Sequence, residues 1–301
     1  MDHPTQVTFH IGVQFSTGRD LLLSAKANAK ILRDQGISMP PIRKARKTIS
    51  DMLSNLDGLP PTPEEQNDVI AQLSGPDKVR HLLLDDDLRG GSLRELFTGP
   101  ELYNGIETRL APVAELFSNT EFRLSLSLIN PAVFLHRALS SGTAARTLQS
   151  FTESTDPTRL RWRDMVLRLR RAIPDVPLII WCNEDAPLIW PQILRNLFDL
   201  PQDVTPEAGL LPLKPLLEDE GLARLSAYLT KFPPETDAQY ERVILLFLDK
   251  YGIEEALSPH CDIPGWDAGT IETVTAQYEE DIELLAEDEG ITLLLPSTPL
   301  A

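Results

Sequence analysis

The residues best suited to chemistry begin near the N-terminus, in the segment HIGVQFSTGRD at positions 10–20. A glycine-containing loop between a strand and a helix can hold an anion with its backbone N–H groups and with the helix N-terminus. Gly12, Ser16, Thr17, Gly18 and Arg19 are the candidates here. The three residues Ser16-Thr17-Gly18 also suit a tight turn that holds no ligand.

Acidic residues follow two later apolar runs. The triplet Asp85-Asp86-Asp87 closes a run that begins at His81, and Glu184-Asp185 follows the run at 178–182. A carboxylate cluster with raised pKa values suits a general base or a metal ligand. The triplet is also typical of a solvated loop with a helix cap. The pair Glu184-Asp185 is also typical of acidic residues in the first turn of a helix.

The histidines and cysteines give weaker evidence for a functional site. His10 ends the first apolar run, where it is either a buried core histidine or a catalytic group. Cys182 and Cys261 are the only cysteines, without Cys-x-x-Cys spacing and without a histidine close to Cys182 in sequence. We therefore predict no metal site, and we read Cys182 as a small buried residue.

Two basic stretches stand out in an acidic chain. Arginines gather between positions 159 and 171, and a smaller basic group spans positions 43–47. Each stretch is either an anion-binding face or a solvated face whose cations pair with nearby carboxylates.

The elements that position these residues follow from hydrophobic periodicity. Residues 7–12 form a β-rich run closed by glycine, and apolar residues from Leu21 to Leu32 recur at helical spacing up to Gly36. Strands are also predicted at 81–84, 122–128, 178–181 and 291–295, and helices at 103–117 and 162–173. Strands that alternate with helices indicate parallel βαβ units.

We therefore expect an α/β fold with a central, mostly parallel sheet and helices on both faces. After residue 205 the pattern becomes mainly helical. We expect one domain over residues 1–301, with an α/β core at 1–204 and a helical extension at 205–301 packed on it.

The amino-acid composition limits the classes of partner that the protein can bind. Forty-five acidic against 28 basic residues give a net charge of -17, which repels nucleic-acid phosphates. The apolar runs are too short to cross a bilayer, and residues 1–6 have neither the basic nor the apolar part of a secretory signal. We expect a cytoplasmic protein without nucleic-acid or membrane partners.

The loop at 10–20 does not match the ATP-type P-loop. Five residues separate Gly12 from Gly18, and Arg19-Asp20 stand where a lysine and a magnesium-binding hydroxyl belong. The segment instead resembles the start of the bacterial sulfotransferase family, His-x-Gly-x-x-Lys-Thr-Gly-Thr-Thr-Ser-Leu. His10, Gly12 and Leu21 match that pattern, whereas Phe15 or, with one inserted residue, Ser16 occupies the lysine position.

The resemblance continues downstream. Residues 84–88 resemble the strand that carries the family's general base, which places Asp86 or Asp87 at that position. The stretch 126–131 resembles the motif for the donor's 3′-phosphate, which ends in Arg-Asn-Pro. Here Asn130 is kept, Ile129 replaces the arginine, and Arg137 replaces a later serine.

The resemblance implies a P-loop sulfotransferase-like fold. It also implies transfer of a sulfuryl group from 3′-phosphoadenosine 5′-phosphosulfate to a hydroxyl or amine of a small-molecule or glycan acceptor. Asp87 or Asp86 would be the base. Gly12, Ser16, Thr17, Gly18 and Arg19 would hold the donor, with Asn130 and Arg137 near its 3′-phosphate.

The missing cations leave a second possibility of equal standing. A lysine that neutralises charge in the transition state is worth several kcal/mol, and an arginine fork on a phosphate supplies affinity. Without them, the chain is either a transferase in which Arg19 or Arg137 substitutes, or an inactive sulfotransferase-fold protein that binds or scaffolds. A glycan-associated module that binds no donor is a third option.

Overall fold

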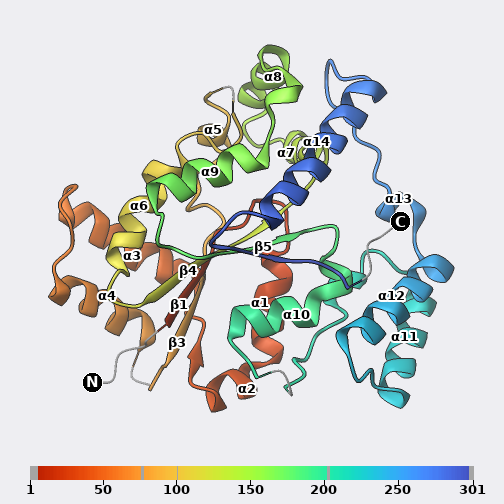
Figure 1. The fold of residues 1–301 in the computed structure, drawn as a ribbon, viewed down its shortest axis with the longest axis horizontal. Helices are drawn as coiled ribbons and strands as arrows, with labels where there is room; N and C mark the ends of the chain where they lie inside the picture. Colours follow the sequence, from red (N-terminus) through yellow and green to blue (C-terminus); the bar gives the residue numbers. More distant parts are fainter. Residues whose placement is uncertain (1–5, 76–77, 100, 202–203, 298–301) are drawn as a thin grey trace.

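The fold is built on a six-stranded sheet in which all strands are parallel. The computed structural model describes residues 6–75, 78–99, 101–201 and 204–297. The strand order is β2-β3-β1-β4-β5-β6, so β1 lies in the middle of the sheet (Figure 1). The strands are β1 (Gln6–His10), β2 (Ile37–Ser38), β3 (His81–Asp85), β4 (Glu121–Leu128), β5 (Leu178–Cys182) and β6 (Ile291–Leu294).

The α/β class and the predicted strands are confirmed. Each apolar run predicted as a strand forms one, including the run near residue 291, which pairs with β5. Buried parallel strands are apolar on both faces, which is why runs such as LIIW form them. The two-residue strand β2 has no signal in the sequence, because a run this short shows no periodicity.

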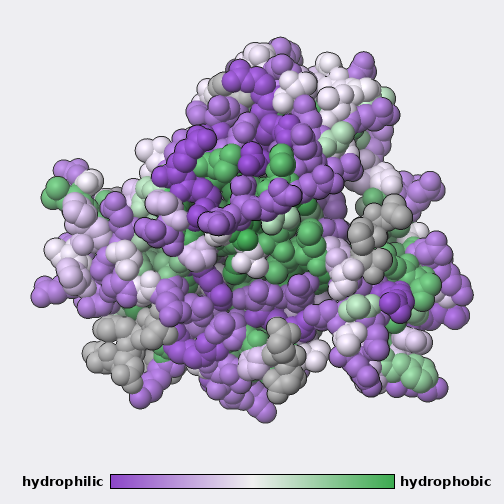
Figure 2. Space-filling view, viewed as in Figure 1, coloured by the Kyte–Doolittle hydropathy of each residue, from purple (hydrophilic) through white to green (hydrophobic). Residues whose placement is uncertain are grey.

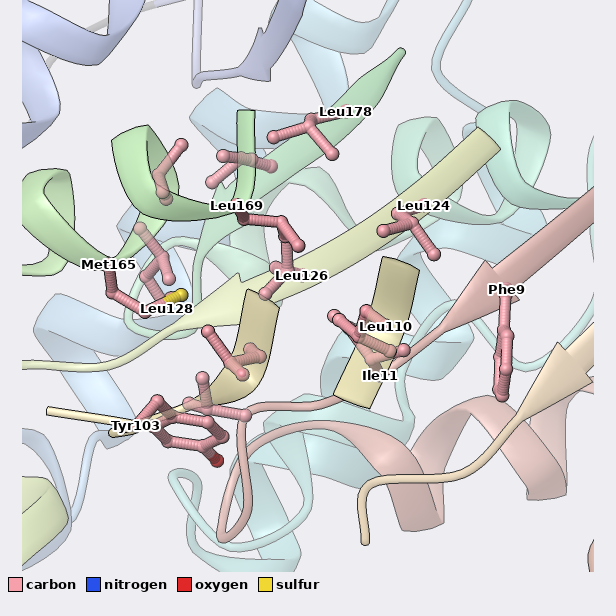
Figure 3. Close-up of a cluster of buried hydrophobic side chains, with 14 of the residues drawn as sticks. Phe9, Ile11, Tyr103, Leu110, Leu124, Leu126, Leu128, Met165, Leu169 and Leu178 are labelled. Carbon is pink, nitrogen blue, oxygen red and sulfur yellow. The ribbon is translucent and has the colours of Figure 1, made fainter. Parts of the chain in front are cut away.

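One face of the sheet carries the larger hydrophobic core. Leu124, Leu126 and Leu128 of β4 point to this face, because alternate residues of a strand share a side. They pack against Leu110 of α6 and Leu169 of α9, as Figure 3 shows. The helices that contribute buried residues here are α3 (Ile42–Leu56), α4 (Pro63–Ser74), α5 (Leu93–Leu96), α6 (Ile106–Leu116), α7 (Pro131–Ser140), α8 (Ala145–Ser154), α9 (Trp162–Ala172) and α14 (Ala268–Ala286).

The opposite face has a second core built around tryptophans. Trp181 of β5 and Trp190 of α10 are both fully buried there. The helices of this side are α1 (Gly18–Ala27), α2 (Ala29–Asp34), α10 (Ala186–Phe198), α11 (Asp219–Lys231) and α12 (Asp237–Tyr251). The short helix α13 (Glu254–Leu257) and the 3-10 turns η1 (Pro157–Arg159) and η2 (Leu211–Leu213) complete the regular structure of the described residues.

The mainly helical character after residue 205 is confirmed. In Figure 1, α11 and α12 lie at the right of the sheet, and α12 packs on α10. The chain then crosses to the other face through α14 and returns to the sheet as β6. Within the described residues, none of the helices is long and apolar enough to span a bilayer.

The helical pattern from Leu21 to Leu32 forms two helices, although the sequence predicts one. The break falls at Asn28, whose side-chain amide donates to the carbonyl of Ser24 at 2.8 Å and to that of Glu207 at 2.9 Å. The Asn28 side-chain oxygen also accepts from the Glu207 amide at 2.8 Å. A residue 179 positions away therefore fixes the break, and periodicity within 21–32 does not reveal it.

The surface is mostly hydrophilic, as the net charge predicts. In Figure 2, hydrophobic surface gathers in the middle of the visible face, where the deep-blue end of the chain crosses in front of the sheet in Figure 1. The edge strand β6 lies in that deep-blue segment, and Leu295 beside it is 41% exposed. The two edge strands, β2 and β6, each pair with a single strand, whereas the strands between them are paired on both sides.

Candidate functional site

The loop between β1 and α1 leaves the carboxyl end of β1, where open parallel sheets bind their ligands. Two amides in the first half of this loop are already bonded inside the protein. The Val13 amide donates to the Ser127 carbonyl at 3.1 Å, and the Gln14 amide donates to the Tyr103 hydroxyl at 2.9 Å. Figure 3 shows this hydroxyl pointing from the core towards the loop. The first half of the loop is thus fixed to the core and offers neither amide to a ligand.

Gly12 has a structural reason to be glycine. Its φ is +93°, and a Cβ at this position would lie 3.0 Å from the Gln14 amide nitrogen and 3.3 Å from Cβ of Asp87. Both the backbone conformation and the close approach to the β3 end exclude a larger residue. The structure therefore brings Gly12 next to the acidic triplet.

A cavity of about 400 Å³ opens beside the second half of the loop. It lies where the segments that follow β1, β4 and β5 meet. Four of the predicted site residues line it together: Ser16, Thr17, Asn130 and Arg137. The remaining lining residues are Asp20, Val133, Asn183, Glu184, Ala186, Pro187, Pro212, Pro215, Leu216, Ala256, Leu257 and Pro259. Gly12, Gly18, Arg19, Asp86 and Asp87 are not among the lining residues.

Thr17 is the side chain that the protein leaves unsatisfied at this cavity. It is 6% exposed, and its hydroxyl has no hydrogen-bond partner among the described residues. Thr17 is the N-cap of α1, yet its hydroxyl makes no capping bond. The first amides of α1 have no acceptor within the helix. Thr17 and the N-terminus of α1 thus lie at the same cavity, and a hydroxyl and a helix N-terminus both suit an anion.

Arg137 brings a cation to the rim of this cavity from α7. One guanidinium nitrogen donates to the Phe15 carbonyl at 2.8 Å, which is the only hydrogen bond of this guanidinium to a described residue. The Phe15 ring packs edge-on against Phe134, with ring centroids 6.1 Å apart. Phe15 therefore lies against α7, and the Arg137 guanidinium stands near the loop.

Asn130 and Ser16 use most of their polar atoms within the protein. The Asn130 side-chain oxygen caps α7 by accepting from the Ala132 amide at 2.9 Å, and its NH₂ donates to the Thr275 hydroxyl at 2.9 Å. The Ser16 hydroxyl donates to the Val13 carbonyl. Both residues shape the cavity, and neither has a free donor comparable to Arg137.

Two carboxylates share the cavity. Glu184 accepts from the Asn130 amide at 2.8 Å and from the Tyr278 hydroxyl at 3.0 Å. Burial raises the pKa of Glu184, and the Asn130 amide opposes this shift. Burial also raises the pKa of Asp20, with Arg19 and Lys214 acting against it. The cavity therefore combines a cation with two acids, and its field is weaker than that of a dedicated phosphate loop.

The acidic triplet is held by arginines from other elements. Asp86 is 2% exposed, and one of its oxygens accepts from Arg46 of α3 at 2.6 and 2.9 Å. Arg89 lies 3.3 Å from the other oxygen. The Asp87 side chain is half exposed, and burial followed by the charge of Asp86 raises its pKa. Both predicted bases pair with Arg46, but Asp86 does so through two hydrogen bonds, whereas Asp87 lies 3.9 Å from Arg46 and faces partly to solvent.

Asp85 is the most perturbed carboxyl of the triplet. Burial, followed by repulsion from Asp87 and Asp86, raises its pKa to about 7. Its backbone pairs with His10 across the β1–β3 ladder. Within the described residues, no group of three histidine, cysteine or acidic side chains is placed to hold a metal ion.

No family model and no curated protein matches this chain. The site therefore rests on its own geometry. The sequence singled out Ser16, Thr17, Asn130 and Arg137, which the structure brings to one cavity. It did not reveal the role of Tyr103, because the bond from that hydroxyl to the Gln14 amide joins residues 89 positions apart.

The burial of His10 makes the stability of the fold depend on pH in the acid range. It is fully buried, its Nδ1 lies 3.2 Å from the Ser125 hydroxyl, and its ring stacks on Trp181. Burial lowers its pKa from 6.5 to about 4. The unfolded chain therefore binds a proton that the folded protein rejects, so His10 favours folding fully above pH 6.5 and progressively less as the pH falls towards 4.

We expect a His10→Gln variant to lose this dependence. Between pH 6.5 and pH 5, the free energy of unfolding of the wild type should fall relative to that of the variant by about 1.6 kcal/mol in total. Urea unfolding of both proteins across this range measures the difference, in which the titration of all other groups cancels. A constant difference would show that His10 binds its proton equally well in the folded and the unfolded protein, so that burial does not lower its pKa.

Proposed function

We propose that this chain is a non-catalytic binding protein with a sulfotransferase-like α/β fold, and that it holds an oxyanion at the N-terminus of α1. One observation carries the proposal. Thr17 lines a cavity beside the first turn of α1, and its buried hydroxyl has no partner among the described residues. A buried hydroxyl without a partner costs about 1–3 kcal/mol, which a bound acceptor removes.

The nearby groups support an anionic ligand. The partial positive charge at a helix N-terminus and the guanidinium of Arg137 act on the same space. A charge-assisted hydrogen bond from an arginine contributes about 1.5–3 kcal/mol. Asp20 and Glu184 oppose the anion, so we expect millimolar rather than micromolar affinity for a bare oxyanion.

The same geometry argues against sulfuryl transfer. A phosphosulfate group would need the loop amides around it, and the amides of Val13 and Gln14 already bond to Ser127 and Tyr103. The candidate bases give no better support, because Asp86 is ion-paired and neither Asp86 nor Asp87 lines the cavity. We therefore favour binding over catalysis.

Calorimetric titration with inorganic phosphate and with adenosine 3′,5′-bisphosphate tests the proposal. We expect phosphate to bind the wild type, and Arg137→Ala to weaken it about ten-fold, since one charge-assisted bond is lost. Thr17→Val, which keeps the shape of the side chain, should weaken it several-fold. Arg171→Ala is the matched control, because it removes an exposed arginine of α9 that has no ion pair among the described residues.

Two results would contradict this account. Equal phosphate affinity in the wild type and in Arg137→Ala would show that the cavity is not the site. Release of adenosine 3′,5′-bisphosphate from the phosphosulfate donor in the presence of an acceptor, lost in Arg137→Ala, would show that the protein is a transferase.

A further inference from the structure

A second cavity lies on the side of α1 that faces away from the cavity at Thr17, and it runs beside the edge strand β2. It encloses about 570 Å³ between α1, α2, β2 and the start of α3. It shares no lining residue with the cavity at Thr17. Its floor is mainly apolar and is formed by Leu22, Ala25, Leu32, Met39, Ile42 and Val79. We call it the β2 groove.

The β2 groove includes the outer edge of β2, where Ile37 is 5% exposed. Among the described strands, β2 pairs only with β3. The Gly36 carbonyl accepts from the His81 amide at 3.3 Å and so points towards β3. Backbone groups of a strand alternate in direction, so the N–H and C=O of Ile37 point to the outer edge. A further strand beside β2 would bond to them.

The rim of the β2 groove is basic. Lys26, Arg33 and Arg43 line it and are exposed. None of the three forms an ion pair with a carboxylate of the described residues. Residues 26–47 contain seven lysines and arginines and a single acid, Asp34, whereas the whole chain has 28 basic and 45 acidic residues. This local excess of positive charge is opposite in sign to the net charge of the protein.

We infer that the β2 groove binds an extended acidic peptide segment of a partner protein, which adds a strand beside β2. The apolar floor takes alternate side chains, and the edge of β2 supplies backbone hydrogen bonds, as in other strand-addition complexes. The basic rim selects glutamate and aspartate at the positions between. A peptide fits this combination better than a small amphipathic anion, because a peptide backbone offers both an acceptor for the Ile37 amide and a donor for the Ile37 carbonyl, whereas an ionised headgroup offers acceptors alone.

Fluorescence anisotropy with a labelled peptide of about ten residues, in which glutamate and valine alternate, tests the inference. We expect the wild type to bind this peptide, and to bind a lysine–valine peptide at least about ten-fold more weakly. The double variant Arg33→Glu/Arg43→Glu should weaken the acidic peptide by about ten-fold or more. The control Arg171→Glu/Arg242→Glu changes the net charge equally at exposed sites outside the groove and should leave affinity within about two-fold.

Two further measurements test separately whether the peptide lies in the groove and whether it bonds to the edge of β2. Ala29→Trp places a large side chain at an exposed lining position and should block the groove without entering the core. Methylation of alternate peptide nitrogens should weaken binding about ten-fold, because it removes the bonds to the edge of β2. Circular dichroism confirms that each variant is folded.

Several outcomes would overturn the inference. The first is no binding of the acidic peptide at millimolar concentration and low salt. The second is equal affinity for the methylated peptide, which would exclude strand addition. The third is wild-type self-association in sedimentation that the Arg33→Glu/Arg43→Glu variant abolishes, which would make a second copy of this chain the occupant. The fourth is binding of dodecyl phosphate in the groove without peptide binding, which would indicate a small amphipathic ligand.

Discussion

Replacing Asp86 by alanine is expected to lower the free energy of unfolding by about 3–5 kcal/mol. Asp86 neutralises Arg46 and Arg89, and the Arg89 side chain is only 13% exposed. Without the carboxylate, a largely buried guanidinium loses its counter-charge. Urea unfolding at pH 7 measures the loss.

The neighbouring residue provides the control. The Asp87 side chain is half exposed and lies 3.9 Å from Arg46, and burial followed by the charge of Asp86 raises its pKa. Asp87→Ala removes this repulsion, so we expect its stability to stay within about 1 kcal/mol of the wild type. Similar losses in the two variants would contradict the assignment of Asp86 as the carboxylate that holds α3 to the end of β3.

Replacing Trp162 by alanine is expected to cost about 3–5 kcal/mol. Trp162 is fully buried, and its ring contacts Tyr103 and Phe134 at centroid distances of 5.7 and 5.6 Å. Its indole N–H donates to the Ile129 carbonyl at 2.7 Å. The residue thus supports the segment that leads from β4 into α7, and through it the position of Arg137.

Trp162→Phe separates the two contributions of this side chain. It keeps an aromatic ring and loses the hydrogen bond, so we expect a smaller loss of about 1–3 kcal/mol from the unpaired carbonyl and the reduced volume. Thermal and urea unfolding of both variants check the order. A Trp162→Ala protein as stable as Trp162→Phe would mean that the ring contacts add little to the core.

The sequence predicts the strands well because a buried parallel strand leaves a plain apolar run. The run at 122–128 and the run at 178–181 both form strands, β4 and β5, and their paired positions follow from the sheet. The helix α10 is less visible from local patterns, because it is buried on nearly every side and so has no polar face. Periodicity is informative only where one side of an element meets water.

The site was predictable in part. The loop after the first strand pointed to Thr17, because ligands of open α/β sheets bind at the carboxyl ends of strands. Arg137 came from the resemblance to the sulfotransferase 3′-phosphate motif. Their surroundings depend on contacts between distant residues. Arg46, which holds Asp86, comes from 40 positions away, and the residues that meet Asn28 and Gln14 come from 179 and 89 positions away. No local pattern reports such contacts.

An amide chemical-shift map during titration with inorganic phosphate tests the central claim most directly. If the anion binds at the first turn of α1, the amides of Gly18, Arg19 and Asp20 shift together with the Arg137 side chain, while those of Val13 and Gln14 stay in place. Large shifts at Val13 and Gln14 would mean that the loop opens and wraps the anion as a phosphate loop does. Unchanged amides at residues 18–20 would mean that no oxyanion binds there.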